Sequence, residues 1–225
     1  FDLDKNSKKK IDLPHMLVDK KEWEIILSNM GIDNNDHIVI YDNSDVISSC
    51  RCWYNFIYFG HNPNLLKVLN GGFKKWLDEK RITSNEIPKN EKTNYKANEL
   101  KNLVKNKDEI EKNIIKETFT VVDARSLGRF QGKEKEPREG LRSGNIKNSF
   151  CIPFNQIVNE NKTFKNKAEI SDIFYENLSD ISSTNVVFSC GSGVTACVLA
   201  LAYSIINDKY LPTIYDGSWA EFGKI

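Results

Sequence analysis

A cysteine followed by two glycines and small polar residues is the stretch of this chain best suited to covalent chemistry. We call it the Cys190 loop, and its sequence is Cys190-Gly191-Ser192-Gly193-Val194-Thr195-Ala196. Backbone N–H groups at the start of a helix have no intrahelical partner, and with the helix dipole they favour a thiolate over a thiol. Glycines let the backbone curl around the sulfur with its N–H groups turned inward, as a nest for an anion. We therefore predict that Cys190 is a nucleophile.

A buried structural cysteine is the alternative for any cysteine between a strand and a helix, because free cysteines are often buried. The Gly-x-Gly that follows Cys190 favours the reactive role, since a structural cysteine needs no close approach of the backbone. Cys197 lies in the following apolar segment without flanking glycines, and we interpret it as a core residue. A cysteine phosphatase would need an arginine at the end of this loop, where the chain has Ala196.

Two predicted elements position the Cys190 loop: a short apolar strand over residues 186–189 and an alanine- and leucine-rich helix over residues 197–206. The same order occurs earlier, with a strand at 38–41 that leads to Asp42 and a helix at 48–59. A glycine follows at nearly the same distance in both copies, Gly71 and Gly217, which indicates an internal duplication. Strand–helix–strand order predicts parallel strands with helical crossovers, and a reactive site beyond their carboxyl ends.

The chain is long enough for two domains of ordinary size. We predict an α/β fold of two tandem domains, each a mainly parallel sheet flanked by helices. The N-terminal domain, residues 1–84, is expected to be non-catalytic, since Asp42 stands where the other copy has Cys190. We also expect this domain to lack its N-terminal part, an opening strand and helix. A polar, lysine-rich linker is predicted over residues 85–116, followed by the catalytic domain over residues 117–225.

Composition excludes several classes of protein. The 32 basic and 31 acidic residues leave a net charge of +1, which offers no electrostatic footprint for nucleic acid or an anionic membrane. No apolar run approaches the roughly 20 residues of a membrane span. Five cysteines without a paired pattern favour a reducing compartment, and the dispersed histidines favour no metal site. We expect a cytoplasmic protein, or a mitochondrial one if a targeting segment precedes residue 1.

Several motifs together resemble the rhodanese superfamily, specifically its two-domain 3-mercaptopyruvate sulfurtransferases. In addition to the Cys190 loop they are Pro14-His15-Met16-Leu17, Arg51-x-Trp53, Gly60-His61, Val122-Asp123-Ala124-Arg125, Gly128-Arg129-Phe130, Glu136-Pro137-Arg138 and Tyr215-Asp216-Gly217-Ser218-Trp219. The thiosulfate-using members of the family carry Cys-Arg-Lys-Gly-Val-Thr-Ala in the loop, so Ser192 favours mercaptopyruvate over thiosulfate.

The resemblance implies a sulfur transfer without a cofactor. Cys190 would take sulfur from 3-mercaptopyruvate as a persulfide, pyruvate would leave, and a thiol such as thioredoxin would accept the sulfur. The two alternatives are a thiosulfate:cyanide sulfurtransferase and a sulfur-relay protein in tRNA thiolation. A non-enzymatic module of the same shape is disfavoured by the intact loop.

The resemblance also implies roles for individual residues. Arg129 and Arg138 match the substrate-binding arginines, whose planar forks suit a carboxylate; the alternative for each is an ion pair with a neighbouring glutamate. Ser192, His15 and Asp4 match a proposed proton relay, although a histidine in this setting is more often a domain-interface residue. The remaining loop residues would bind the substrate, namely Gly191, Gly193, Val194 and Thr195. We expect the hydroxyl of Thr195 to cap the helix, and the Asp123–Arg125 pair to be a structural salt bridge.

Overall fold

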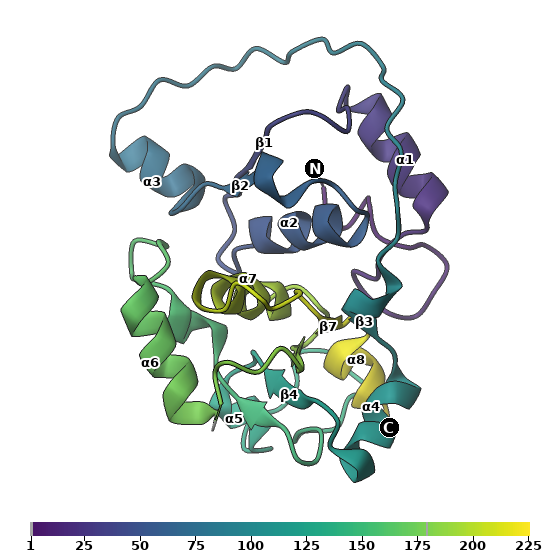
Figure 1. Ribbon diagram of the computed structural model, residues 1–225, viewed down its shortest axis with the longest axis vertical. Helices are drawn as coiled ribbons and strands as arrows, with labels where there is room; N and C mark the ends of the chain where they lie inside the picture. Colours follow the sequence, from purple (N-terminus) through teal and green to yellow (C-terminus); the bar gives the residue numbers. More distant parts are fainter. Residues whose placement is uncertain (1, 179) are drawn as a thin grey trace.

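Two parallel sheets and the helices around them make up the computed structural model, which describes residues 2–178 and 180–225 (Figure 1). The N-terminal half, up to residue 103, contains α1 (Lys20–Asn29), β1 (Ile38–Ile40), α2 (Ser49–Tyr58), η1 (Pro63–Leu65), β2 (Leu66–Val68), α3 (Gly72–Asp78) and η2 (Lys101–Leu103). The C-terminal half contains β3 (Val104–Lys105), α4 (Lys107–Lys116), β4 (Thr120–Asp123), α5 (Leu127–Phe130), β5 (Phe150–Cys151), η3 (Phe154–Ile157), α6 (Lys167–Asn177), β6 (Val186–Ser189), α7 (Ala196–Ile206), β7 (Ile214–Tyr215) and α8 (Ser218–Phe222). The predicted α/β class with parallel strands and flanking helices is confirmed.

The larger sheet has the strand order β3-β7-β6-β4-β5, and all its neighbours pair in parallel. Its inner strands β7, β6 and β4 are almost entirely buried, so both of their faces are covered. Val187 packs in a cluster with Trp219 of α8, whereas the next residue, Phe188, packs on Tyr203 of α7 with ring centroids 5.8 Å apart. Burial on both faces explains why β6 is a continuous apolar run. Because β6 is the central strand, Cys190 follows it at the middle of the sheet's carboxyl edge.

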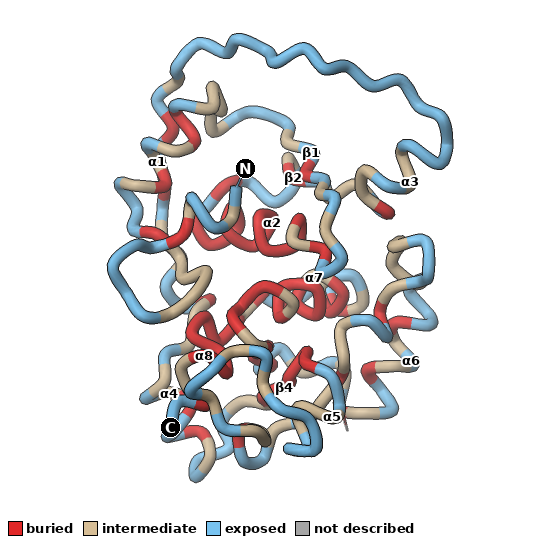
Figure 2. Tube along the Cα trace, turned by 180° about the vertical axis from the view of Figure 1, so that it is seen from behind, coloured by how far each residue is buried: buried red, intermediate tan, exposed pale blue. Residues whose placement is uncertain are grey.

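The predicted internal duplication is visible in the topology. In one copy β1 pairs with β2 in parallel, with α2 between them in sequence; in the other β6 pairs with β7, with α7 between them. The two equivalent helices pack against each other at the contact between the halves (Figures 1 and 2). Every residue of α2 is buried, including the polar Arg51 and Asn55. Buried polar groups need partners, so these two side chains have to be satisfied by neighbouring segments.

The interval predicted as a linker, residues 85–116, divides into two parts. Its first part is mostly exposed and runs along the outside of the N-terminal half (Figure 2). Tyr95 and Ala97 are buried within it, and the Tyr95 ring stacks on His61. Its last part belongs to the larger sheet, because Val104 of β3 pairs with Ile214 of β7 and α4 follows at once. Strand β3 was not predicted, since a strand of two residues leaves no periodic signal in the sequence.

Within the described residues, no helix combines the length and the apolar character that crossing a membrane requires.

Candidate active site

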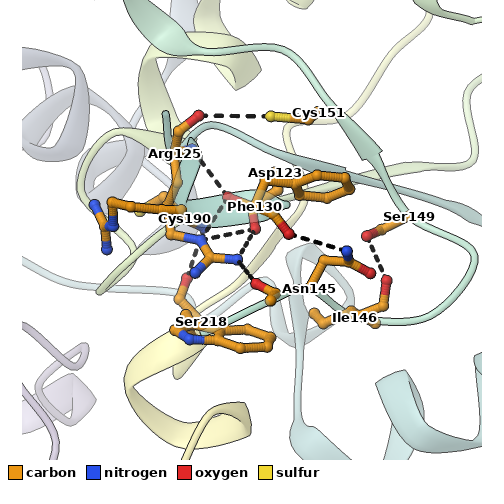
Figure 3. Close-up of polar contacts among 12 residues, drawn as sticks. Asp123, Arg125, Phe130, Asn145, Ile146, Ser149, Cys151, Cys190 and Ser218 are labelled. Atoms are coloured by element: carbon orange, nitrogen blue, oxygen red, sulfur yellow. Dashed lines mark hydrogen bonds and ion pairs between the residues drawn. The ribbon is translucent and has the colours of Figure 1, made fainter. Parts of the chain in front are cut away.

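The Cys190 loop begins where β6 ends, and α8 holds its first residues. The Cys190 N–H donates to Ser218 Oγ at 3.2 Å (Figure 3), and the Cys190 carbonyl accepts from the Trp219 N–H at 2.9 Å. The Gly191 carbonyl accepts from the Ala220 N–H at 2.9 Å. Cys190 itself is buried, with 1% of its surface exposed. The backbone on either side of the sulfur is therefore fixed before any substrate binds.

The middle of the loop keeps its N–H groups free. Within the described part of the chain, the N–H groups of residues 191–195 have no hydrogen-bond acceptor. Gly193 has a φ of 76°, in the left-handed region that only glycine adopts readily. Thr195 occupies the N-cap position of α7, but its hydroxyl makes no capping bond, so that detail of the prediction was wrong. Unpaired N–H groups ahead of a helix form a site for negative charge.

The structure brings Ser192, His15 and Asp4 into one hydrogen-bonded chain. His15 Nδ1 lies 2.9 Å from Ser192 Oγ, and His15 Nε2 lies 3.1 Å from Asp4 Oδ1. A carboxylate can only accept, so the neutral imidazole that fits both contacts carries its proton on Nε2 and accepts the Ser192 hydroxyl at Nδ1. Burial lowers the pKa of His15, and the attraction of Asp4 opposes this only in part. The neutral form is therefore favoured at neutral pH.

The two predicted substrate-binding arginines flank Gly191. A Cβ placed on that glycine would lie 3.2 Å from Arg129 Nη2 and 3.6 Å from Arg138 Nη1. Arg138 Nη2 also lies 3.4 Å from Ser192 Oγ, and Arg138 has no carboxylate partner among the described residues. Arg129 differs, because Glu136 accepts from its Nε at 3.1 Å and its Nη2 at 2.5 Å. The ion pair considered as an alternative is thus present at Arg129, whereas the Arg138 fork lies beside the loop without a carboxylate partner among the described residues.

A buried network of charged side chains supports Arg129. The predicted Asp123–Arg125 salt bridge is confirmed, with 2.7 Å between Arg125 Nη2 and Asp123 Oδ2 (Figure 3). Arg125 Nη1 donates to Glu136 at 2.7 Å, so Arg125 and Arg129 share one carboxylate. The Arg125 guanidinium also lies over the Trp219 ring, 4.2 Å from its centroid. Arg129 is therefore held in place by buried side chains that are connected to β4, rather than by exposed ones.

The other buried thiols differ from Cys190 in their surroundings. Burial raises the pKa of Cys50 well above its usual value and that of Cys52 to about 12. Burial likewise raises the pKa of Cys197, whose thiol donates to the Gly193 carbonyl at 3.2 Å. These residues are neutral core thiols, as predicted for Cys197. Among the described residues no cluster of histidine, cysteine or carboxylate side chains could hold a metal ion.

Known proteins are similar in sequence to this one over nearly the whole chain. The family described as Rhodanese-like domain matches residues 5–79. The mouse 3-mercaptopyruvate sulfurtransferase is 35% identical over 224 residues, which cover 99% of this chain and 74% of that protein. The rat thiosulfate sulfurtransferase is 35% identical over 210 residues, covering 92% of this chain and 69% of that protein. The chain belongs to the rhodanese-like sulfurtransferases.

Solved structures agree with this assignment. The crystal structure of the Tum1 protein of Saccharomyces cerevisiae superposes with a TM-score of 0.87 at 28% identity, covering 99% of this chain and 77% of that one. Because mercaptopyruvate and thiosulfate sulfurtransferases match at the same identity, the comparisons define a sulfurtransferase of this group and leave its donor open.

Two residues of this sulfurtransferase that contact the loop had no role in the sequence-based hypothesis. Arg51 of α2 donates to the Gly193 carbonyl at 2.8 Å, and Asp216, just after β7, pairs with Arg51 at 2.8 Å. The available signal was an arginine within an otherwise largely apolar helix, which needs a buried partner. The sequence of α2 does not show which residue that partner is.

Proposed function

We propose that this sulfurtransferase uses 3-mercaptopyruvate as its donor and carries the sulfur as a persulfide on Cys190. The observation that carries the choice of donor is the environment of Ser192. This position has a hydroxyl hydrogen-bonded to His15, and among the described residues Arg138 is the one cationic side chain that hydrogen-bonds to it. Thiosulfate is a dianion that gains from added positive charge beside the cysteine. Mercaptopyruvate is a monoanion with a carbonyl that a hydroxyl can bind.

The proposed first step breaks a carbon–sulfur bond. The Cys190 thiolate attacks the donor sulfur, and the electron pair of the carbon–sulfur bond stays on the carbon as pyruvate enolate. The proton of the donor thiol moves to that carbon, which leaves pyruvate and a Cys190 persulfide anion. The Ser192–His15 chain is suited to carry this proton, because neutral His15 accepts the serine hydroxyl. The free N–H groups of the loop would stabilise the negative persulfide.

Arg138 is the residue best suited to bind the donor carboxylate, since its guanidinium has no carboxylate partner among the described residues. We propose that a thiol, for which thioredoxin is our candidate, then attacks the outer sulfur and takes it with the thiol proton, restoring the Cys190 thiolate.

Initial rates with 3-mercaptopyruvate and with thiosulfate, each with a thiol and with cyanide as acceptor, test the donor. We expect a rate that strongly favours mercaptopyruvate and disappears in Cys190→Ser. In Ser192→Lys the preference should move toward thiosulfate. A wild-type preference for thiosulfate would contradict the donor while leaving the family intact. Activity with neither donor would favour the sulfur-relay alternative, in which a partner protein accepts the persulfide.

A further inference from the structure

Arg51 is a fully buried charge that connects the two halves of the molecule. It lies on α2 of the N-terminal half, and no part of its side chain is exposed. Its Nε donates to Asn55 Oδ1 at 2.9 Å, and its Nη1 donates to the Gly193 carbonyl at 2.8 Å. Its Nη2 donates to the His15 carbonyl at 2.8 Å and pairs with Asp216 at 2.8 Å. Each nitrogen of the guanidinium therefore has a partner: Nε one on the same helix, and Nη1 and Nη2 partners in three other segments.

The contact with Gly193 determines the direction of a peptide group in the Cys190 loop. In a trans peptide the carbonyl and the following N–H point in opposite directions. With the Gly193 carbonyl held toward Arg51, the Val194 N–H is turned away from α2, and it has no acceptor in the described part of the chain. Cys197 donates to the same carbonyl. The arginine thus keeps one N–H of the loop available for an anion.

The same guanidinium also holds the segment that carries His15. The His15 carbonyl is bound by Arg51, and the Leu17 N–H donates at 2.9 Å to the other oxygen of Asp216. His15 has a φ of 60°, an unfavourable value for a side chain of its size. The Arg51–Asp216 ion pair thus makes two hydrogen bonds to this segment, which stabilise the conformation in which His15 Nδ1 contacts Ser192 Oγ.

We propose that Arg51 is a positioning residue for sulfur transfer, which couples the N-terminal half to catalysis by fixing the Gly193 peptide and the His15 backbone at once. The inference rests on the proposed role of Cys190. Arg51 does not contact the sulfur, and it acts through the loop and the histidine. A lysine cannot replace it, since a single ammonium on a flexible stem lacks the planar fork that reaches two carbonyls.

Arg51→Lys is the informative variant, because it keeps a positive charge opposite Asp216. We expect kcat per folded molecule with 3-mercaptopyruvate, and the single-turnover rate of Cys190 persulfide formation, to fall about 10- to 100-fold, the size of effect that a small misplacement of catalytic groups produces. KM should change little. In a His15→Gln background the same substitution should cost less, because part of its effect passes through His15. Arg81→Lys is the matched control, since the Arg81 side chain is exposed and its charged contacts, with Glu79 and the Trp76 ring, lie outside the Cys190 loop.

Arg51→Gln combined with Asp216→Asn supplies a second variant, in which the buried charge pair becomes uncharged and neither partner is left unpaired. Each variant's folded fraction is measured by thermal unfolding and near-UV circular dichroism. If Arg51→Lys folds and keeps the wild-type kcat per folded molecule, the proposal is overturned and Arg51 is a stabilising residue only. If Arg51→Lys does not fold, the same result in the double variant overturns the proposal. Sulfur transfer that persists in Cys190→Ser would instead reject the proposed role of the cysteine, which separates the two failures.

Discussion

The two arginines beside Gly191 differ in how much of their charge is already used. Arg129 shares the buried Glu136 with Arg125, whereas the Arg138 guanidinium donates to Ser192 Oγ and has no carboxylate partner among the described residues. An arginine without a carboxylate partner can bind an incoming carboxylate without first losing one. We therefore assign the main substrate contact to Arg138 and a mixed role to Arg129.

Alanine substitution should separate these roles. Arg138→Ala should lower kcat/KM for mercaptopyruvate by the equivalent of about 1.5–3 kcal/mol and leave the free energy of unfolding within about 0.5 kcal/mol of wild type. Arg129→Ala should affect both quantities, because Glu136 would keep Arg125 as its single cationic partner, at a cost of about 1–3 kcal/mol in stability. Steady-state kinetics and urea unfolding measure the two. Equal loss of stability in both variants would contradict the assignment.

His15 gives the molecule a pH dependence whose sign follows from its burial. Burial lowers its pKa below the usual 6.5. Between that lowered value and 6.5 the unfolded chain binds more protons than the folded one, so the free energy of unfolding rises with pH there and is lost as pH falls. His15→Gln should remove this contribution, so that the free energy of unfolding changes less with pH below 6.5. Urea unfolding at pH values on both sides of 6.5 measures the difference. His61, whose pKa burial also lowers, remains in both proteins. Identical pH profiles of the two proteins would show that His15 titrates alike in the folded and unfolded states.

The conformation of the Cys190 loop depends on Gly193, because a residue without a side chain lets Arg51 and Asp216 approach the backbone of the loop closely. A Cβ at this position would lie 2.5 Å from Arg51 Nη1 and 2.9 Å from the Asp216 carbonyl oxygen. Gly140 has a similar φ of 73°, but a Cβ there would meet nothing within 4 Å. The two glycines therefore differ in crowding rather than in backbone conformation.

This pair provides a controlled prediction. Gly140→Ala should cost only the left-handed conformation, about 1–2 kcal/mol of stability. Gly193→Ala carries the same cost plus the clash with Arg51, so it should be less stable than Gly140→Ala and should lose most sulfurtransferase activity. Thermal unfolding and initial rates of both variants give the comparison. Full activity in a folded Gly193→Ala protein would show that the loop tolerates displacement of Arg51.

The contact between α2 and α7 joins the two halves over buried surface, and it holds Cys50 and Cys197, both fully buried. Burial raises the pKa of both thiols, and only a thiolate reacts readily with an alkylating agent. We expect both to resist iodoacetamide in the native protein and to become reactive together with the global transition in urea. Pulse alkylation followed by mass spectrometry of the cysteine peptides measures this. Labelling of Cys50 ahead of that transition would mean that the halves separate before they unfold.

The repeated strand–loop–helix unit and the Cys190 loop could be predicted from the sequence because their signals are local. An apolar run such as β6, the glycines after Cys190 and the apolar helix α7 are contiguous, and each describes its own backbone conformation and burial. His15 and Asp4 were named through resemblance to a family rather than through any spacing between them and the cysteine. The two-residue strand β3 was missed, because so short a strand has no pattern of its own.

The partners of the buried polar groups were decided by the packing of α2 on α7. His15 and Ser192 are 177 positions apart and meet because this packing brings the start of the chain to the loop. The sequence of α2 indicates that Arg51 is buried, and it cannot indicate that Gly193, His15 and Asp216 receive its hydrogen bonds. Burial can be inferred from the apolar character of a residue's neighbours in sequence, whereas a hydrogen-bond partner depends on two segments that only folding brings together.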